Sequence, residues 1–180
     1  MTIWNIARAC KGHLAVPAGK HTGTCPAAGM AVIRGYSGKE AAGIVIDSRK
    51  VEPGDIFVAI RGERVDGHQF IREVFDKGAI AVVCEEEPEE LPGPCIRVED
   101  SLAALRQIAA FYREQMPIPI VGITGSVGKT STKEFVASVL AQKYKTHKTQ
   151  GNFNNEIGVP LTLLSMPEDT EAAVVEMGIN

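Results

Sequence analysis

The chain has 180 residues, of which 44% are hydrophobic, and a formal net charge of −3. This length can bury a core as one domain or as two small ones, and the negative charge argues against general nucleic-acid binding. The four cysteines include no C-x-x-C pair, so neither a zinc site nor a disulfide framework is indicated. The longest apolar runs have only the length of a strand, which argues against a membrane span or a signal peptide and favours the cytoplasm.

The first 116 residues predict an α/β unit. A short amphipathic helix is expected at residues 3–10, whereas residues 11–43 are rich in Gly, Pro and Ala and predict only short strands and turns. Beyond them, strands are predicted at 44–46, 56–60, 79–84 and 95–98, and helices at 68–77 and from Asp100 or Ser101 to Met116. Strand, loop, helix and strand in this order predict a parallel βαβ crossover.

A second α/β unit is predicted after Pro117 and Pro119, which lie where a hinge between domains is expected. We therefore predict two domains, residues 1–116 and 117–180. In the second, strands are predicted at 118–123, 144–148 and 172–175, a helix from Thr130 to about Gln142 that presents Phe135, Val136, Val139 and Leu140, and a short helix or turn at 160–164. About 64 residues are marginal for an independent fold, so we expect the sequence to stop inside a larger nucleotide-binding domain.

A glycine-rich turn follows the strand at 118–123 and ends in Gly128-Lys129-Thr130. Glycines let the backbone approach a ligand closely, and the free N–H groups at the start of the next helix attract phosphate. Lys129 adds a full positive charge, and the Thr130 hydroxyl is suited to Mg²⁺. The usual G-x-x-x-x-G-K-[ST] pattern requires glycine at position 123, where this chain has Ile123. The alternative is a strand-to-helix turn with incidental glycines.

Charge is unevenly distributed around this turn. Between residues 129 and 150 the only acidic residue is Glu134, and there are five lysines: Lys129, Lys133, Lys143, Lys145 and Lys148. Residues 85–100, by contrast, are strongly acidic. The basic part coincides with the proposed phosphate site, although a solvated helix face explains some of these lysines.

Polar residues at strand ends provide further candidates. Glu176 ends an apolar strand and suits Mg²⁺ beside Thr130, but it is equally explained as a polar residue that ends a buried strand. Asp47-Ser48-Arg49 follows a strand at the edge where open α/β sheets bind ligands. Arg49 matches a diphosphate bidentately, or the segment is an Asx turn with a surface arginine. His68 is better explained as a loop or helix-capping residue than as a catalyst.

Three asparagines, Asn152, Asn154 and Asn155, lie in a polar segment after the basic region. They can cap and turn the chain without touching a ligand. Three amides beside a phosphate site can equally orient a polar substrate.

Taken together, the motifs resemble the Mur ligase family from about residue 40 onward. The segment from Asp47-Ser48-Arg49 to Phe57-Val58-Ala59, followed by Asp66-Gly67-His68, is similar to the family's N-terminal UDP-substrate domain. The segment from Gly122 to Thr130 resembles its ATP loop, displaced glycine included. The segment from Asn152 to Leu164, followed by Glu176-Met-Gly, resembles the branch that adds D-alanyl-D-alanine rather than the branch that adds the third peptide residue.

The resemblance implies a small N-terminal α/β UDP-substrate domain followed by the start of a P-loop parallel-sheet ATPase domain, and a cytoplasmic, monomeric ligase. ATP and Mg²⁺ are the implied cofactors, and UDP-MurNAc-tripeptide and D-Ala-D-Ala are the implied substrates, with no nucleic-acid or membrane partner. ATP would contact Gly125, Ser126, Val127, Gly128, Lys129, Thr130 and Ser131, with Lys129 as the catalytic residue; Thr130 and Glu176 would hold Mg²⁺; and Ser48, Arg49, Thr149, Asn154 and Asn155 would contact the UDP-peptide substrate.

The family's carbamylated lysine, its adenine pocket and its C-terminal domain have no counterpart in this sequence. We therefore expect an inactive fragment of an ATP-dependent ligase. The alternatives are the ligase that adds the third residue and a non-catalytic module that binds a UDP-sugar or a nucleotide.

Overall fold

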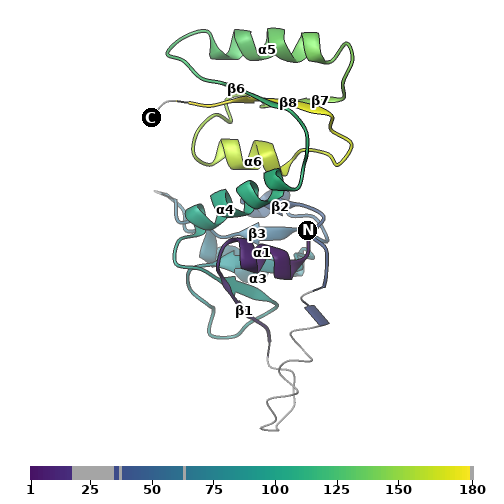
Figure 1. Cartoon of the computed structure of the whole chain (residues 1–180). Helices are drawn as coiled ribbons and strands as arrows, with labels where there is room; N and C mark the ends of the chain where they lie inside the picture. The colour runs from purple at the N-terminus through teal and green to yellow at the C-terminus, as the bar shows by residue number, and fades with distance from the viewer. Residues whose placement is uncertain (18–34, 37, 63, 179–180) are drawn as a thin grey trace. The chain divides into compact units, whose positions relative to one another are not determined.

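The computed structural model describes residues 1–17, 35–36, 38–62 and 64–178. They form two compact units, Met1–Ile108 and Ala109–Asn180, and each unit is built on its own β-sheet (Figure 1). Helix α4, Ser101–Glu114, runs across the division between the two units.

The first unit is a five-stranded sheet in the order β1-β5-β4-β3-β2. Its elements before α4 are α1 (Ile3–Ala9), β1 (His13–Ala15), β2 (Ile44–Val45), η1 (Ser48–Lys50), β3 (Ile56–Val58), η2 (Gly67–Phe70), α3 (Ile71–Asp76), β4 (Ala81–Cys84) and β5 (Cys95–Arg97). Strands β2 to β5 are parallel and β1 is antiparallel to β5. The predicted βαβ crossover is confirmed, because η2 and α3 connect β3 to its parallel neighbour β4.

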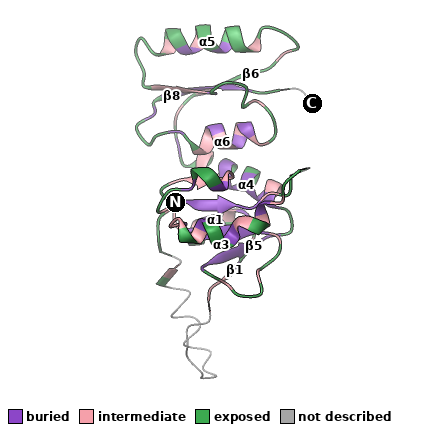
Figure 2. Cartoon of the chain, turned by 180° about the vertical axis from the view of Figure 1, so that it is seen from behind, coloured by how far each residue is buried: buried purple, intermediate pink, exposed green. Residues whose placement is uncertain are grey.

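The core of this unit lies around its central strands, which Figure 2 shows as buried. Every residue of β3 and β4 is buried, as expected for parallel strands covered on both faces. Phe57 of β3 is fully buried and packs in one cluster with Val74 of α3 and Val82 of β4. Because β2 to β5 are parallel, the loops that follow them leave from the same edge of the sheet.

The predicted elements are present, and the differences lie at their ends. The helix predicted at 68–77 starts as the 3₁₀ turn η2, because the Asp66 carboxylate accepts a hydrogen bond from the backbone N–H of His68. Asp100 caps α4: its Oδ1 accepts hydrogen bonds from the N–H groups of Leu102 and Ala103. The structure describes residues 11–17, which include β1, and residues 35–36 and 38–43, which precede β2. The rest of the segment 11–43, residues 18–34 and 37, lies outside the described residues.

The second unit is an all-parallel sheet in the order β6-β8-β7 that lies between two helices (Figure 1). Its elements after α4 are β6 (Ile120–Ile123), α5 (Lys129–Leu140), β7 (Thr146–Lys148), α6 (Gly158–Leu164) and β8 (Ala172–Glu176). β8 is buried along its whole length. Among the described residues, β7 pairs only with β8 and so lies at the edge of this sheet.

The buried face of α5 agrees with the predicted one only in part. Val136 and Leu140 are half-buried on the face that carries the buried Lys133 and Ala137. Phe135 and Val139, which were expected on that face, are 73% and 71% exposed. The helix packs against β8 through its buried face, and Figure 2 shows exposed residues along much of α5.

Candidate phosphate and metal site

The glycine-rich turn connects β6 to α5 in a conformation that only glycine adopts easily. Gly125 has φ of 145° and Gly128 has φ of 76°, both in the left-handed half of backbone space. A Cβ atom added at Gly128 would meet nothing within 4 Å. The glycine at 128 is therefore required by its backbone conformation and not by crowding, and open space adjoins the start of α5.

The backbone amides of this turn are available to a ligand. Among the described residues, no backbone or side-chain hydrogen bond takes an N–H group of residues 125 to 131. Lys129 folds over the turn, where its Nζ donates to the carbonyl oxygen of Gly125 at 2.8 Å. Free amides around left-handed glycines at a helix N-terminus form a concave anion site. The turn thus has the geometry of a phosphate cradle.

A cluster of polar side chains gathers around Glu176, at the end of β8. The Thr130 hydroxyl donates to Glu176 Oε1 at 3.3 Å, and Asn154 Nδ2 donates to the same oxygen at 2.8 Å. Buried Thr149 accepts a hydrogen bond from the backbone N–H of Glu176 through its Oγ1 at 2.9 Å. The fold thereby brings together four of the candidate residues: Thr130, Thr149, Asn154 and Glu176.

The Glu176 side chain is 2% exposed. Burial alone would raise the pKa of Glu176, but the hydrogen bonds from Asn154 and Thr130 and the positive charge of Lys133 outweigh it and lower that pKa. The carboxyl group is therefore ionised at neutral pH, as a ligand of a hard cation must be.

The residues present fit Mg²⁺. Mg²⁺ is held by one or two carboxylates together with waters and phosphate oxygens, and here one carboxylate and one hydroxyl lie beside the phosphate cradle. Glu176 Oε2 is buried without a hydrogen-bond partner, so this carboxylate keeps unused capacity to accept. Within the described residues there is no cluster of three or more His, Cys, Asp or Glu side chains that would hold a metal alone.

Sequence reasoning missed one member of this cluster, Lys133. Its side chain is 2% exposed, and its Nζ lies 3.6 Å from Glu176 Oε2 and 3.3 Å from Glu134 Oε1. Position 133 is three residues after Thr130 and so shares its helix face. That spacing was the available signal.

Asn155 stands apart from the cluster. Its Oδ1 accepts hydrogen bonds from the backbone N–H groups of Ile157 and Gly158, at 3.2 and 2.7 Å. The side chain thus turns the chain into α6, as the capping interpretation of these asparagines predicts. Ser126, Val127 and Ser131 are exposed on the turn and on the first turn of α5.

Asp47-Ser48-Arg49 follows β2 and forms the turn η1. Arg49 donates to Asp47 from Nε at 2.9 Å and from a terminal nitrogen at 2.8 Å, and its own backbone N–H also bonds Asp47. The Arg49 side chain is 84% exposed, whereas Ser48 is buried and its carbonyl accepts from Lys77 Nζ. The Asx turn of the alternative interpretation is therefore present, and it presents an arginine fork to solvent.

The Asp47 carboxyl group is expected to titrate near pH 2 when followed by carbon NMR. Hydrogen bonds from Arg49 lower the pKa of Asp47 to about 2, below its value of about 3.9 in an unfolded chain. The folded state therefore favours the ionised form, and this contribution to stability is present above about pH 4 and lost as the pH falls towards 2.

The Arg49→Ala variant should move the midpoint of the Asp47 titration upward, towards about 3.9. The matched change Arg72→Ala, which removes an exposed arginine paired with Glu90, should leave it in place. An unchanged midpoint in Arg49→Ala would contradict the assignment.

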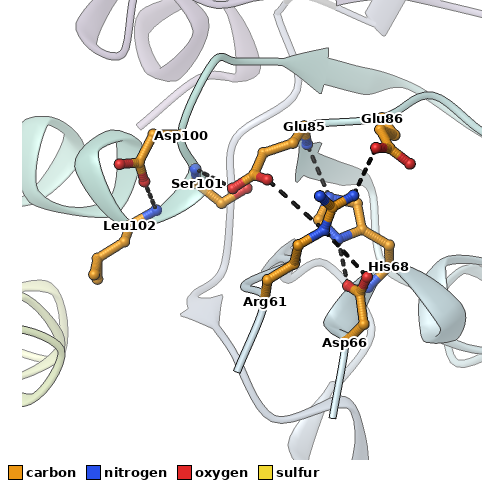
Figure 3. A network of polar contacts seen from close by, with 8 residues as sticks. All are labelled: Arg61, Asp66, His68, Glu85, Glu86, Asp100, Ser101 and Leu102. Carbon is orange, nitrogen blue, oxygen red and sulfur yellow. Dashed lines mark hydrogen bonds and ion pairs between the residues drawn. The ribbon is translucent and has the colours of Figure 1, made fainter. Parts of the chain in front are cut away.

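His68 belongs to a network at the carboxyl ends of β3 and β4 (Figure 3). Its Nδ1 lies 2.6 Å from Asp66 Oδ1, and its Nε2 accepts from the backbone N–H of Glu85 at 2.9 Å. Glu85 Oε1 in turn accepts from the N–H of Ser101 at the start of α4. Arg61 contacts Asp66 and Glu86 at 3.2 and 2.7 Å. Both ring nitrogens are engaged, which is what a structural role for His68 requires.

A cavity of about 740 Å³ lies beside this network in the first unit. Basic Lys11, His13 and Arg97 and acidic Glu85 and Asp100 are among the residues that line it. None of the predicted site residues is among them.

Comparisons with known proteins bear on both units. Residues 40–113 match the model of the Mur ligase family, catalytic domain, and residues 123–180 match that of the Mur ligase middle domain. The chain belongs to the Mur ligase family. The family resemblance and the α/β fold expected from the motifs are thus confirmed.

Relatives of this Mur ligase chain include the UDP-N-acetylmuramoyl-tripeptide–D-alanyl-D-alanine ligase of Bacillus subtilis, which is 41% identical over 99% of the chain and 36% of its own length. The crystal structure of MurF from Acinetobacter baumannii matches with a TM-score of 0.80 and 33% identity, over 99% of the chain and 36% of its own. MurF from Thermotoga maritima in complex with ADP matches with a TM-score of 0.70 and 37% identity, over 78% and 32%.

The Mur ligase chain spans about a third of the length of these relatives. The likeness to the first two reaches into residues 1–39, which the motifs matched only loosely. In the part of the chain that the structure describes, no helix is both long and apolar enough to cross a membrane.

Proposed function

We propose that this chain carries the UDP-substrate unit and the ATP loop of a cytoplasmic, ATP-dependent amide ligase, one that joins D-Ala-D-Ala to UDP-MurNAc-tripeptide. The observation that carries the proposal is the set of amides at residues 125–131 that bond no group in the described part of the chain, around left-handed Gly125 and Gly128. The curated relatives with that ligase name, 41% identical in the case of Bacillus subtilis, support the choice of substrates.

In this proposal, the amides of residues 125–131 bind the phosphates of ATP. Each charge-assisted hydrogen bond contributes about 1.5–3 kcal/mol, so several that converge hold a polyphosphate firmly. Lys129 leaves the Gly125 carbonyl and neutralises charge on the γ-phosphoryl group as it is transferred. The reaction is the phosphorylation of a peptide carboxylate to an acyl phosphate, which the amine of D-Ala-D-Ala then attacks.

Thr130 and Glu176 are the proposed Mg²⁺ ligands, because they lie 3.3 Å apart beside the cradle. Mg²⁺ supplies charge neutralisation at the phosphate oxygens. Asn154 orients Glu176 through its 2.8 Å hydrogen bond and is the proposed contact for the muramoyl peptide. Thr149 is fully buried and supports the backbone of Glu176, and Asn155 caps α6, so these two expected contacts are not proposed.

Ser48 and Arg49 are the proposed contacts for the UDP part of the substrate. The exposed guanidinium of Arg49 matches a diphosphate bidentately, and it would exchange Asp47 for that ligand. We place the functional boundary near residue 116, with UDP-substrate binding in residues 1–116 and the start of the ATP-binding domain in residues 117–180. A monomer is the proposed state.

Titration of the protein with ATP and MgCl₂ tests the cradle. We expect ATP to bind more tightly in the presence of Mg²⁺, and we expect the amide NMR signals of residues 125–131 to shift most, because those N–H groups are unbonded in the free protein. UDP serves as the control and should leave these signals in place. Shifts confined to other residues would contradict the proposal.

The rival ligase adds the third residue of the peptide. The full-length protein should therefore be assayed with UDP-MurNAc-tripeptide plus D-Ala-D-Ala, and in parallel with the dipeptide precursor plus a diamino acid. Phosphate release and product in the first assay alone support the proposal. Product in the second alone identifies the rival, and nucleotide binding without product in either favours a non-catalytic binding module.

A further inference from the structure

Lys133 has an unusual environment for a lysine. It lies in the middle of α5 with its side chain 2% exposed, between Glu134 Oε1 at 3.3 Å and Glu176 Oε2 at 3.6 Å. Lysine is almost never fully buried unless its charge is paired. A methionine of similar length would fill the same space without the cost of removing a charge from water, so packing alone does not account for the ammonium group.

The contacts of Glu176 divide its carboxylate into two sides. Oε1 faces the phosphate turn and receives the hydrogen bonds of Thr130 and Asn154. Oε2 has no hydrogen-bond partner among the described residues, and Lys133 Nζ lies 3.6 Å from it. The ammonium thus attracts one oxygen of the carboxylate, while Thr130 and Asn154 bond the other.

Lys133 is itself held in place by a chain of alternating charges. Glu134 contacts both Lys133 and Lys148 of β7, so the series Lys148, Glu134, Lys133, Glu176 connects β7, α5 and β8. Attractions between successive members fix the ammonium relative to the sheet. Because Lys133 is buried, solvent screens its attraction for Glu176 less than it screens a surface pair.

We propose that Lys133 is a positioning residue that acts through Glu176, holding this carboxylate in the orientation that receives Mg²⁺ together with nucleotide. The inference rests on the proposed function of the same site. Lys133 is not expected to touch phosphate, because its side chain is buried and its ammonium lies between Glu134 and Glu176.

The test measures the affinity of the full-length protein for ATP by calorimetry across a series of MgCl₂ concentrations. In Lys133→Met, the Mg²⁺ concentration that gives the half-maximal gain in ATP affinity should rise about tenfold or more, the loss typical when the outer partner of a metal ligand is removed. ATP affinity without Mg²⁺ should stay within about twofold of wild type, as expected of a residue that does not contact phosphate.

Two variants serve as controls for Lys133→Met. Lys133→Arg keeps the charge and should retain most of the Mg²⁺ effect, with a midpoint within about threefold of wild type. Lys143→Met makes the same chemical change as Lys133→Met just beyond the end of α5, where Lys143 is exposed, and should change neither the midpoint nor the ATP affinity.

A lower melting temperature for Lys133→Met with an unchanged Mg²⁺ midpoint would overturn the inference, because the lysine would then be merely structural. A lower midpoint would also overturn it, since Lys133 would then compete with the metal. If wild type binds no ATP at any Mg²⁺ concentration, the proposed function itself fails. If wild type binds ATP and Lys133→Met keeps the wild-type Mg²⁺ midpoint, only the positioning role is refuted.

A measurement on wild type covers the case in which Lys133→Met does not fold. The side-chain nitrogen NMR signal of Lys133 should shift when Mg²⁺ is added to the ATP complex, because Glu176 redistributes its charge towards the metal, while the signal of Lys143 should not. A Lys133 signal that stays unchanged would overturn the inference.

Discussion

The Lys129→Ala variant of the full-length protein is expected to lose ATP-dependent ligation, with a fall in turnover of about a hundredfold to a thousandfold or more. Removal of one preorganised donor at a developing charge costs this much in enzymes, and Lys129 provides a full charge at the cradle. Among the described residues, its Nζ bonds only the Gly125 carbonyl, at 2.8 Å. Truncation should therefore leave the fold intact.

The readouts for Lys129→Ala are phosphate release, product formation and the affinity for the UDP-substrate. The last should be nearly unchanged, because Ser48 and Arg49 lie in the other compact unit. Lys143→Ala serves as the matched control and should ligate at the wild-type rate. If Lys129→Ala turns over normally, the assignment of the cradle is wrong.

The second large effect concerns stability. Phe57→Ala is expected to lower the free energy of unfolding of the first unit by about 3–5 kcal/mol, because it removes a fully buried aromatic side chain and leaves a cavity between β3, β4 and α3. Urea denaturation followed by circular dichroism measures the change as a shift of the midpoint.

Phe135→Ala makes the same chemical change where the side chain is 73% exposed on α5. Its free energy of unfolding should stay within about 0.5 kcal/mol of wild type. Equal losses for the two variants would contradict the burial that the structure assigns to the two phenylalanines.

Most of the strands, the phosphate turn and the Thr130–Glu176 pair could be predicted, because each follows from the residue types in a short stretch of sequence. Short buried apolar runs such as Ala81–Cys84 form strands where they are covered on both faces. Gly125 and Gly128 adopt the left-handed conformations that a tight strand-to-helix turn demands. The candidate Thr130 and Glu176 fall at the ends of adjacent elements and meet across 3.3 Å.

Burial on α5 was the part that could not be predicted. Phe135 and Val139 have the apolar character of a core face, yet they are exposed, and Lys133 is buried in their place. A helical pattern shows which residues share a face but not which face meets the sheet, because this depends on the strand beneath it. Here that strand ends in Glu176, and a charge on β8 favours a lysine on the helix above it.

The sequence by itself determined the alternation of strands and helices, the phosphate turn and the family, because each depends on neighbouring residues and their short-range conformations. Three facts were decided only by the tertiary structure: Thr130 contacts Oε1 of Glu176, Asn155 caps α6, and the buried Lys133 contacts Oε2 of Glu176. Those contacts join residues up to 46 positions apart, and their geometry exists only once β8 and α5 have packed together.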